Sequence, residues 1–513
     1  MIWHYLKLSF RNIGRSLLLS GINLVGLSLG LASSFIILIY ISDSLGYDKY
    51  HEKHDRIYRI ISKHPKYDLI SNWNSYFIAE EFSNSIPDFS EVLRISDRTY
   101  NINILKDEMY LPEQKVKYAD GNIFKVFSIE LIEGDPETAL ENPFSVVITE
   151  EMAIKYFGKV NVVGSTLAIK VDNRDFDIMI TGILKEIPRL STFQANMIFN
   201  TELCIKIEDK KSDKNNYSER DFILYTLVNG EHNKSEIEER LIQLTKKYNI
   251  HEDIVFELQN IKDIYLKSDE IFYDNGRKGT LANIRIFSLV GIMILLISCI
   301  NYIIISISQS AIRNKEIAIR KISGASRLKI MKQILGESIF MSLIALPTAV
   351  VLVELFLPAI NNLFSVELVL NYFNEGGYVL SMAIITIIIG IFSGAYISIY
   401  LSGLKPISIL KQRSSIIGSK NYFGKSLIIL QICLFSGLIF SSFIISKQIH
   451  YAISMNHGFN KDNLISLGAA YVNDNMEFVK PFDNSYPQFI EEISQNSDII
   501  NAAGCVLGPI TGS

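Results

Sequence analysis

Two short stretches of the sequence contain residue types that could bind a metal ion or a nucleotide. In the first, His51 and His54 flank Glu52, and imidazole and carboxylate groups are common ligands of zinc. The H-E-x-x-H motif of zinc hydrolases places one more residue between its histidines, and no third ligand is evident nearby. We therefore interpret these three residues as exposed polar groups on a stalk, and we predict no metal site.

The second stretch, Gly424-Lys425-Ser426, matches only the end of the phosphate-binding motif G-x-x-x-x-G-K-[ST], in which backbone amides hold phosphate groups. The first glycine of that motif would fall at position 419, which is Ser419. The stretch also leads directly into an apolar segment, and no strand precedes it. We predict no nucleotide site, no cofactor and no catalytic residue in this chain.

The cysteines are too few for a disulfide-dense scaffold. Their positions form no C-x-x-C metal or redox site, because they are Cys204, Cys299, Cys433 and Cys505. Cys204 and Cys505 would pair only across distant parts of the chain. We therefore expect free or buried thiols.

Five long apolar segments dominate the 513-residue chain. Charged residues make up 20% of it, below the roughly 25% of soluble domains, and its mean hydropathy is +0.21. Each segment exceeds the roughly 20 residues that cross a bilayer as a helix. The segments are 17–41, 286–312, 338–360, 378–404 and 426–446. This pattern predicts a multi-pass membrane protein and excludes a disordered chain. The first segment is too long for a cleaved signal peptide.

Lysine and arginine are concentrated on one side of these segments. Three basic residues and no acid precede the first segment, and five basic residues and no acid lie in 405–425. The loop 313–337 has seven basic residues and two acids, whereas 361–377 has two acids and no basic residue. By the positive-inside rule, the N-terminus and both basic loops are cytoplasmic, so 43–283 is extracytoplasmic. A net charge of only −4 gives no indication of a nucleic-acid partner.

Residues 43–283 form a polar insertion that is large enough to fold alone. Its pattern predicts strands at 145–149, 166–171, 176–184 and 222–227. A helix is expected between the N-cap Thr149 and Gly158, and another from the capping box Asn233–Glu236 to about Lys247. The fold class that follows is an α-helical transmembrane bundle with a large mixed α+β extracytoplasmic domain inserted between spans 1 and 2. We expect two lobes in this domain, the second from about residue 188.

The most distinctive cytoplasmic sequence begins at Arg313. Residues 313–322 can form a short amphipathic helix, Gly324 can end it, and Ser326 can cap the helix that follows. By composition alone, the short helix could be an interfacial anchor that binds anionic lipid. In the segment Gly403–Lys411, Pro406 limits continuation of the helix, and Ile407–Leu410 could lie along the inner surface in the same way.

At these residues the chain resembles the FtsX/MacB type of ABC-transporter permease. The similar stretches of the membrane part are LKLSFRNIGRSLLLSGINLVGLSLGLA, NKEIAIRKISGASRLKIMKQILGESIF and LKPISILK. In the insertion, YDKYHEKHDRIYRI, YADGNIFKVFSIELIEGDPETAL and VVITEEMAIKYFG resemble the MacB-like periplasmic core. The resemblance covers nearly all of residues 1–410.

The resemblance implies a permease of the bacterial plasma (inner) membrane that transmits motion from a cytoplasmic ABC ATPase, for export of an unknown substrate. The helix 313–323 would be the coupling helix seated on that ATPase. The residues expected there are Glu316, Ile317, Arg320, Lys321, Gly324 and Ala325, with Lys405 and Pro406 as a second inner-surface contact. The other implied partners are a second permease unit (a homodimer or internal repeat), the lipid bilayer, and a periplasmic adaptor or wall enzyme, but no nucleic acid. ATP hydrolysis would belong to the partner subunit.

The family pattern of one span, an outside domain and three spans divides the chain into 1–42, 43–283, 284–412, 413–446 and 447–513. The last two parts resemble the opening of a second unit, so we expect a truncated chain. Two other functions stay open. One is an FtsX-like regulator of a cell-wall hydrolase that transports nothing, and the other is a non-ABC membrane sensor or scaffold. They differ in what the outside domain binds and in whether the loop 313–323 binds an ATPase.

Overall fold

The computed structural model describes residues 17–64, 66, 69–96, 102–106, 109–113, 115–171, 174–207, 222–230, 233–247, 254–272, 274, 276–364, 366–370, 378–403, 422–455, 485–496, 499 and 502. The chain divides into two compact units. We call the described residues of 17–45 and 281–455 the helical unit, and those of 46–280 the sheet domain.

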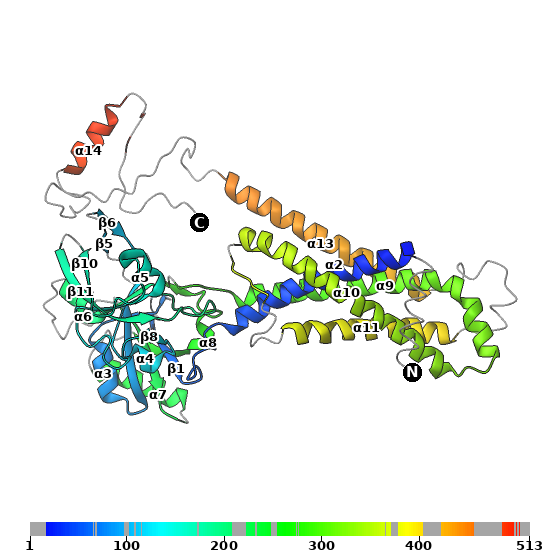
Figure 1. Cartoon of the computed structure of the whole chain (residues 1–513), viewed down its shortest axis with the longest axis horizontal. Coiled ribbons are helices and arrows are strands. Elements are labelled where there is room, and N and C mark those ends of the chain that lie inside the picture. Colours follow the sequence, from blue (N-terminus) through cyan, green and yellow to red (C-terminus); the bar gives the residue numbers. More distant parts are fainter. Residues whose placement is uncertain are drawn as a thin grey trace. The chain divides into compact units, whose positions relative to one another are not determined.

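The helical unit contains five helices that are long and apolar enough to cross a membrane, as the sequence predicts (Figure 1). They are α2 (Leu17–Gly46), α9 (Leu281–Ile322), α10 (Arg327–Phe364), α11 (Tyr378–Gly403) and α13 (Tyr422–Ser454). The helices α9 and α10 continue well beyond the predicted apolar segments 286–312 and 338–360, so both extend into the basic loop between them.

The main difference from the prediction lies at the end of α9. Residues 313–322, which we expected to form a separate short helix, are the last turns of this 42-residue helix. The change from apolar to charged residues does not end the helix, because lysine, glutamate and arginine are strong helix formers. The second span and the predicted coupling segment are therefore one continuous element.

The turn between α9 and α10 follows the prediction. Gly324 has a φ of +88°, a left-handed conformation that glycine adopts without steric cost. Ser326 Oγ accepts a hydrogen bond from Lys329 N at 3.4 Å in the first turn of α10. We call the residues 316–337, which include this turn and the helix ends beside it, the elbow.

Small residues let the helices of this unit approach closely. An alanine Cβ built at Gly30 of α2 would lie 2.5 Å from Ser298 of α9, and one at Gly394 of α11 would lie 2.7 Å from Ser338 of α10. Gly26 and Gly390 lie four residues before these glycines and face the same neighbouring helices. Both pairs have the G-x-x-x-G spacing of membrane helix interfaces. The backbone at these glycines therefore lies directly against side chains of the neighbouring helix, and this sets how closely α2 packs on α9 and α11 on α10.

A buried carboxylate connects two helix ends. The hydroxyl of Tyr378, at the start of α11, donates a hydrogen bond of 2.8 Å to Asp43 Oδ1 near the end of α2. Asp43 is 3% exposed and Tyr378 is 9% exposed. Because a buried carboxylate is costly without donors, this bond favours one relative placement of the two helices.

The sheet domain is built on one mixed sheet of fifteen strands in its described residues. The strands are β1 (Ile57–His64), β2 (Leu69–Ser71), β3 (Trp73–Asn74), β4 (Phe89–Ser96), β5 (Asn103–Lys106), β6 (Met109–Pro112), β7 (Val116–Ala119), β8 (Leu131–Glu133), β9 (Ser145–Thr149), β10 (Thr166–Val171), β11 (Arg174–Leu184), β12 (Met197–Asn200), β13 (Phe222–Val228), β14 (Val255–Asn260) and β15 (Ile271–Phe272). The main path runs β15-β2-β1-β13-β4-β7-β12-β9-β11-β10-β5-β6. The pairs β7–β12, β9–β11 and β2–β15 are parallel, and the other pairs are antiparallel.

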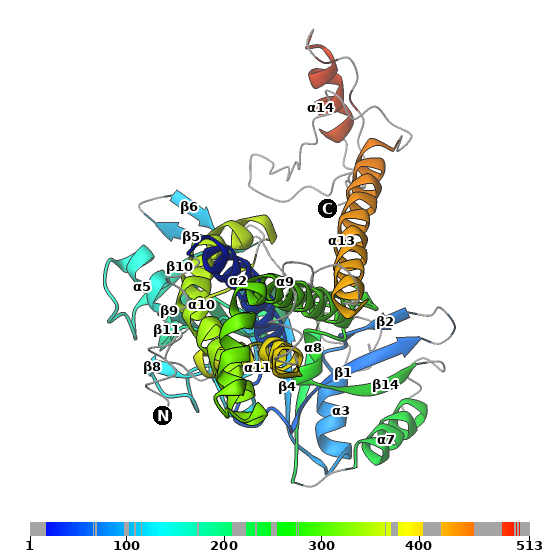
Figure 2. The same ribbon diagram turned by 90° about the vertical axis from the view of Figure 1, so that its right-hand side faces the viewer.

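Alternate residues of β13 enter two separate cores, one on each face of the sheet. Leu224 belongs to the larger core, whereas its neighbours Ile223 and Tyr225 belong to the smaller one. The larger core includes side chains of α3 (Ile78–Ser85), α5 (Glu150–Phe157), α6 (Thr201–Ile207) and α7 (Lys234–Lys247). The smaller core includes side chains of α4 (Ile123–Val126) and α8 (Ile261–Ile264). Figure 2 shows α3 and α7 beside β14, where Phe82 of α3 meets Phe256 edge to face.

The local sequence signals of this domain are confirmed. Thr149 Oγ1 accepts from Met152 N at the start of α5, and Gly158 ends that helix with a φ of +69°. Asn233 Oδ1 accepts from Ser235 N before α7. Strands β9, β10, β11 and β13 occupy the predicted segments.

The helix α14 (Ser485–Ser494) lies in the C-terminal part of the chain.

A lobe boundary near residue 188 does not divide the sheet. The strand β12 pairs with β7 and β9, and β13 pairs with β1 and β4, although both follow residue 188 in the sequence. The chain returns to fill positions between earlier strands, and sequence order does not reveal this. The domain limits predicted for the rest of the chain stay predictions.

Candidate functional site

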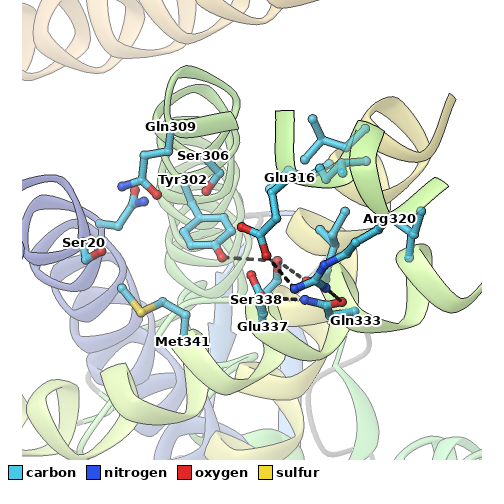
Figure 3. Close-up of a pocket in the computed structure, with 16 residues that line it drawn as sticks. Ser20, Tyr302, Ser306, Gln309, Glu316, Arg320, Gln333, Glu337, Ser338 and Met341 are labelled. Atoms are coloured by element: carbon cyan, nitrogen blue, oxygen red, sulfur yellow. Dashed lines mark hydrogen bonds and ion pairs between the residues drawn. The ribbon is translucent and has the colours of Figure 1, made fainter. Parts of the chain in front are cut away.

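The elbow contains most of the residues that the sequence singles out for coupling, and one arginine joins its two helices. Arg320, in the last turn of α9, donates to Glu316 Oε1 at 2.5 Å and to Gln333 Oε1 of α10 at 2.6 Å. Gln333 Nε2 in turn donates to Glu337 Oε1 at 3.2 Å (Figure 3). Charge-assisted bonds of this kind are stronger than neutral ones. The network therefore holds α9 and α10 together across Gly324.

Two further basic residues attach the elbow to the end of α11. Lys321 Nζ donates to the backbone oxygen of Ser402 at 2.6 Å, and Arg327 Nε donates to Ser402 Oγ at 3.3 Å. Burial, and then the charge of Arg327, lower the pKa of Lys321 below its ordinary value. The last turn of α11 thus accepts positive charge at its carbonyl end, as the helix dipole favours.

A polar pocket of about 90 Å³ lies beside this network, between α2, α9, α10 and α11. Figure 3 shows Glu316 and Arg320 on one side of it and Ser20 and Gln309 on the other. Tyr302 donates to Ser338 Oγ at 3.2 Å in its wall. The pocket is wide enough for several water molecules.

Two amide groups of the pocket each have one hydrogen-bonding atom without a partner in the part of the chain that the structure describes. Asn23 Oδ1 and Gln309 Nε2 are buried and have no hydrogen-bond partner among the described residues. Asn23 is only 3% exposed, and both residues line the pocket. One atom is an acceptor and the other a donor, and water in the pocket can satisfy each of them. We therefore regard the pocket as a hydrated space inside the helical unit.

The predicted coupling residues lie in different surroundings. Ile317 is buried in the core of the helical unit, and Arg320 and Lys321 form the intramolecular bonds described above. Glu316 and Gly324 are exposed, and Ala325 is half-buried. Lys405 and Pro406 lie outside the described residues. The coupling role of all eight residues stays a prediction.

Sequence analysis missed several residues of the elbow. It did not single out Gln333 as the partner of Arg320, or Glu337 as the partner of Gln333, although the spacing of four residues places Gln333 and Glu337 on one face of α10. It also missed three apolar side chains that the elbow exposes. These are Ile319, Ile322 and Leu328, which are 58%, 63% and 67% exposed. Large apolar side chains within a charged loop could have indicated these exposed residues, because such side chains often mark an interaction site.

The predicted exposure of the histidine pair in the sheet domain is wrong for His51. Its side chain is buried at 1% exposure, and Nδ1 accepts a hydrogen bond from Ser128 N at 3.0 Å. Burial, and then the charge of His54, lower the pKa of His51 to about 3, so its imidazole is neutral at physiological pH. Packing of His51 against Tyr50 and Phe127 explains the error, because the stalk folds into the domain.

No metal-binding cluster of three or more histidine, cysteine or acidic side chains occurs among the residues that the structure describes. Cys204, Cys299 and Cys433 form no disulfide within this part of the chain. Cys505 lies outside the described residues.

Two family models match the chain. The MacB-like periplasmic core domain matches residues 20–240, and the FtsX-like permease C-terminal domain matches residues 288–406. None of the curated proteins compared with the chain matches it.

Three solved structures resemble part of the chain. A domain of a permease protein from Porphyromonas gingivalis has 21% identity and a TM-score of 0.35, and it covers 46% of this chain and 98% of its own. The periplasmic region of MacB from Actinobacillus actinomycetemcomitans has 14% identity and a TM-score of 0.30, with coverages of 43% and 92%. The extracellular domain of the ABC-type transporter YknZ from Gram-positive bacteria has 12% identity and a TM-score of 0.29, with coverages of 40% and 100%.

The two family models together match more than half of the chain. Their order agrees with the observed architecture, in which a large mixed α/β domain lies in sequence between the first and second of five apolar helices. The chain therefore belongs to the FtsX/MacB-like family of ABC-transporter permeases.

Proposed function

We propose that this chain is the permease subunit of an ABC transporter in the bacterial plasma membrane. Its elbow receives motion from a cytoplasmic ATPase, and its sheet domain, on the other side of the membrane, uses this motion to export or extrude a substrate. In this proposal, ATP hydrolysis belongs to the partner subunit.

The observation that carries the proposal is the continuity of α9. This helix of 42 residues begins one residue after the sheet domain ends and reaches the elbow without interruption. At 1.5 Å per residue it is about 63 Å long, about twice the thickness of a hydrocarbon core. A hydrogen-bonded rod of this length can transmit a displacement at one end to the segment at its other end.

The exposed surface of the elbow supports a partner at this place. Ile319, Ile322 and Leu328 lie on both sides of Gly324 and are each more than half exposed. Their burial in a groove of the partner would supply hydrophobic stabilisation, at about 25 cal/mol per Å² of apolar area. The hydrogen bonds of Arg320 and Lys321 within the helical unit keep the elbow rigid when the partner subunit moves it.

Co-purification with candidate ABC ATPase subunits tests the proposal. We expect the full chain to retain an ATPase, and the variant Ile319→Asp with Ile322→Asp to lose it, because two carboxylates would be buried at the contact. A matched control is Ile132→Asp, which changes an isoleucine of 51% exposure in the sheet domain. Failure of the unaltered chain to retain any ATPase would refute the function, and retention by the double variant would refute the elbow as the contact.

A further inference from the structure

A second pocket, of about 190 Å³, opens within the sheet domain. It lies over neighbouring strands of the smaller core, where Arg59 of β1 pairs with Tyr225 of β13 and Ile223 pairs with Ile95 of β4. The loop residues Thr192–Gln194 and 276–277 form other parts of its wall. We call this site the basic pocket. It has room for on the order of a dozen water molecules and so for a small polar group.

The charge of the basic pocket is opposite to that of its domain. Arg59, Lys115, Lys117 and Arg277 line it, and Asp274 is the only acidic residue among its lining residues. Residues 46–280 as a whole contain 31 lysines and arginines and 41 aspartates and glutamates. An acidic domain that gathers four basic side chains around one recess creates a local positive potential, which attracts anions.

The acidic residue of the pocket is already neutralised. Arg59 Nη1 donates to Asp274 Oδ2 at 2.9 Å, and both side chains are at most 5% exposed. Gln259 and Ser268 accept the other hydrogen bonds of Arg59. This pair forms a rigid, neutral wall. The other basic side chains that line the pocket are Lys115, Lys117 and Arg277.

The backbone of Lys115 adds a second sign of a specialised site. Its φ is +56°, in the left-handed region that residues other than glycine rarely adopt, and its oxygen accepts a hydrogen bond from Asn196 N at 2.8 Å. Strained conformations of this kind persist only where the surrounding structure holds them, and they are found often at binding sites. The strain fixes the position of a lysine at the pocket.

The remaining walls are apolar and aromatic. Phe193, Ile223 and Tyr225 are each at most 7% exposed, and Ile95 and Ile264 lie with them in the smaller core. A recess with cationic groups and a hydrocarbon floor matches a ligand that carries both an anionic and an apolar part. An inorganic anion would contact only the cationic groups. An uncharged apolar molecule would contact only the apolar walls.

We propose that the basic pocket binds an anionic amphiphile, with a carboxylate or phosphate group at Lys115, Lys117 and Arg277 and the first carbons of its chain against Phe193 and Tyr225. Arg277 also donates to the backbone oxygen of Arg189 at 3.3 Å, which connects this group to the loop that carries Thr192. The site lies within the sheet domain alone. The proposal is therefore independent of ATPase coupling.

Binding to the purified full chain in an uncharged detergent tests the proposal, with no ATPase present. The probes are laurate and dodecyl phosphate, with dodecanol and inorganic phosphate as comparisons, measured by displacement of a fluorescent fatty acid. We expect both amphiphiles to displace it, and both comparison molecules to be at least tenfold weaker. If inorganic phosphate competes as well as the amphiphiles, the pocket is a site for free anions. If dodecanol competes as well as they do, the pocket is an apolar groove. Either result would overturn the proposal.

Matched variants localise the site. Lys117→Gln with Arg277→Gln should weaken binding of both amphiphiles about tenfold or more, because charge-assisted bonds to the head group are lost. Lys117→Arg with Arg277→Lys should retain binding within about threefold, which separates loss of charge from misfolding. Lys49→Gln with Lys159→Gln makes the same change in net charge at two exposed residues outside the pocket lining. Equal binding by the first variant and this control would overturn the assignment to the basic pocket.

Discussion

The close approach of α2 and α9 gives a prediction with a control in the same helix. We compare Gly30→Ala with Gly21→Ala, since both change glycine to alanine in α2. The new Cβ at Gly30 would lie 2.5 Å from Ser298, whereas nothing lies within 4 Å of one at Gly21. Ordinary contact begins at 3.4 Å. The helices must therefore separate by about 1 Å in the first variant and not at all in the second.

The expected magnitudes follow from two opposing effects. Alanine favours a helix over glycine by about 0.8–1.0 kcal/mol, and this gain applies at both positions. Overpacking of a well-packed interface costs about 1–3 kcal/mol, and this cost applies only at Gly30. Separation would also lengthen the bond of 3.2 Å from Ser298 Oγ to the oxygen of Gly26. We expect Gly21→Ala to be neutral or stabilising, and Gly30→Ala to be less stable than Gly21→Ala by about 1–3 kcal/mol.

The assay is unfolding of the purified full chain in dodecyl maltoside micelles by increasing fractions of dodecyl sulfate, followed by far-ultraviolet circular dichroism. A second variant, Gly30→Ala with Ser298→Gly, removes the side chain that the new Cβ would meet. Its loss of stability should be smaller than the sum of the losses in Gly30→Ala and Ser298→Gly, because the two sites are in contact and their effects are not additive. Equal shifts in Gly30→Ala and Gly21→Ala, or additive losses in the double variant, would refute close packing at Gly30.

Two further predictions concern charged groups of the sheet domain. Burial raises the pKa of Asp48 from 3.8 to about 6, and hydrogen bonds from Thr192 are the main opposing effect. The protonated carboxyl group therefore stabilises the fold at low pH, and this contribution is lost as the pH rises through 6. The stability of the unaltered chain relative to Asp48→Asn should therefore fall by about 2–2.5 kcal/mol between pH 4 and pH 7 in thermal unfolding, and a rise over this range would contradict the assignment. Arg59→Met should cost about 3–5 kcal/mol, because the charge of Asp274 stays buried without its partner. Lys63→Met, in a pair with Glu257 that is more than a third exposed, should cost less than about 1 kcal/mol, and equal costs would show that burial does not decide the difference.

Features that depend on a few neighbouring residues could be predicted from the sequence. Thr149 and Gly158 bound a helix through bonds within four residues, and Gly324 ends α9 because its own backbone adopts a positive φ. The five apolar helices follow from length and composition, and the strand β10 follows from alternation. In each of these cases, the residues that determine the feature lie within the helix, turn or strand itself.

Features that depend on distant residues could not be predicted. His51 is buried by Phe127, which lies 76 residues later, and β12 enters the sheet between strands that precede it by about 50 and 80 residues. Arg320 finds Gln333 only because the turn at Gly324 folds α10 back onto α9. The end of the second span was misjudged for another reason. Charged residues limit insertion into lipid but do not limit a helix, so α9 continues to Ile322.

The pairing of β1 has a consequence for how the sheet domain is made. Tyr58 of β1 lies opposite Thr226 of β13 and Asn260 of β14, so these two neighbours of the strand are synthesised long after it, whereas its third neighbour, β2, follows directly. At about 5–20 residues per second, β14 follows β1 from the ribosome after roughly 10–40 s. During that interval β1 has neither of these neighbours, and an unpaired strand edge can pair with other chains. The domain therefore completes its fold only late in synthesis, when α9 is about to emerge, and a chaperone that covers β1 until then should raise its yield.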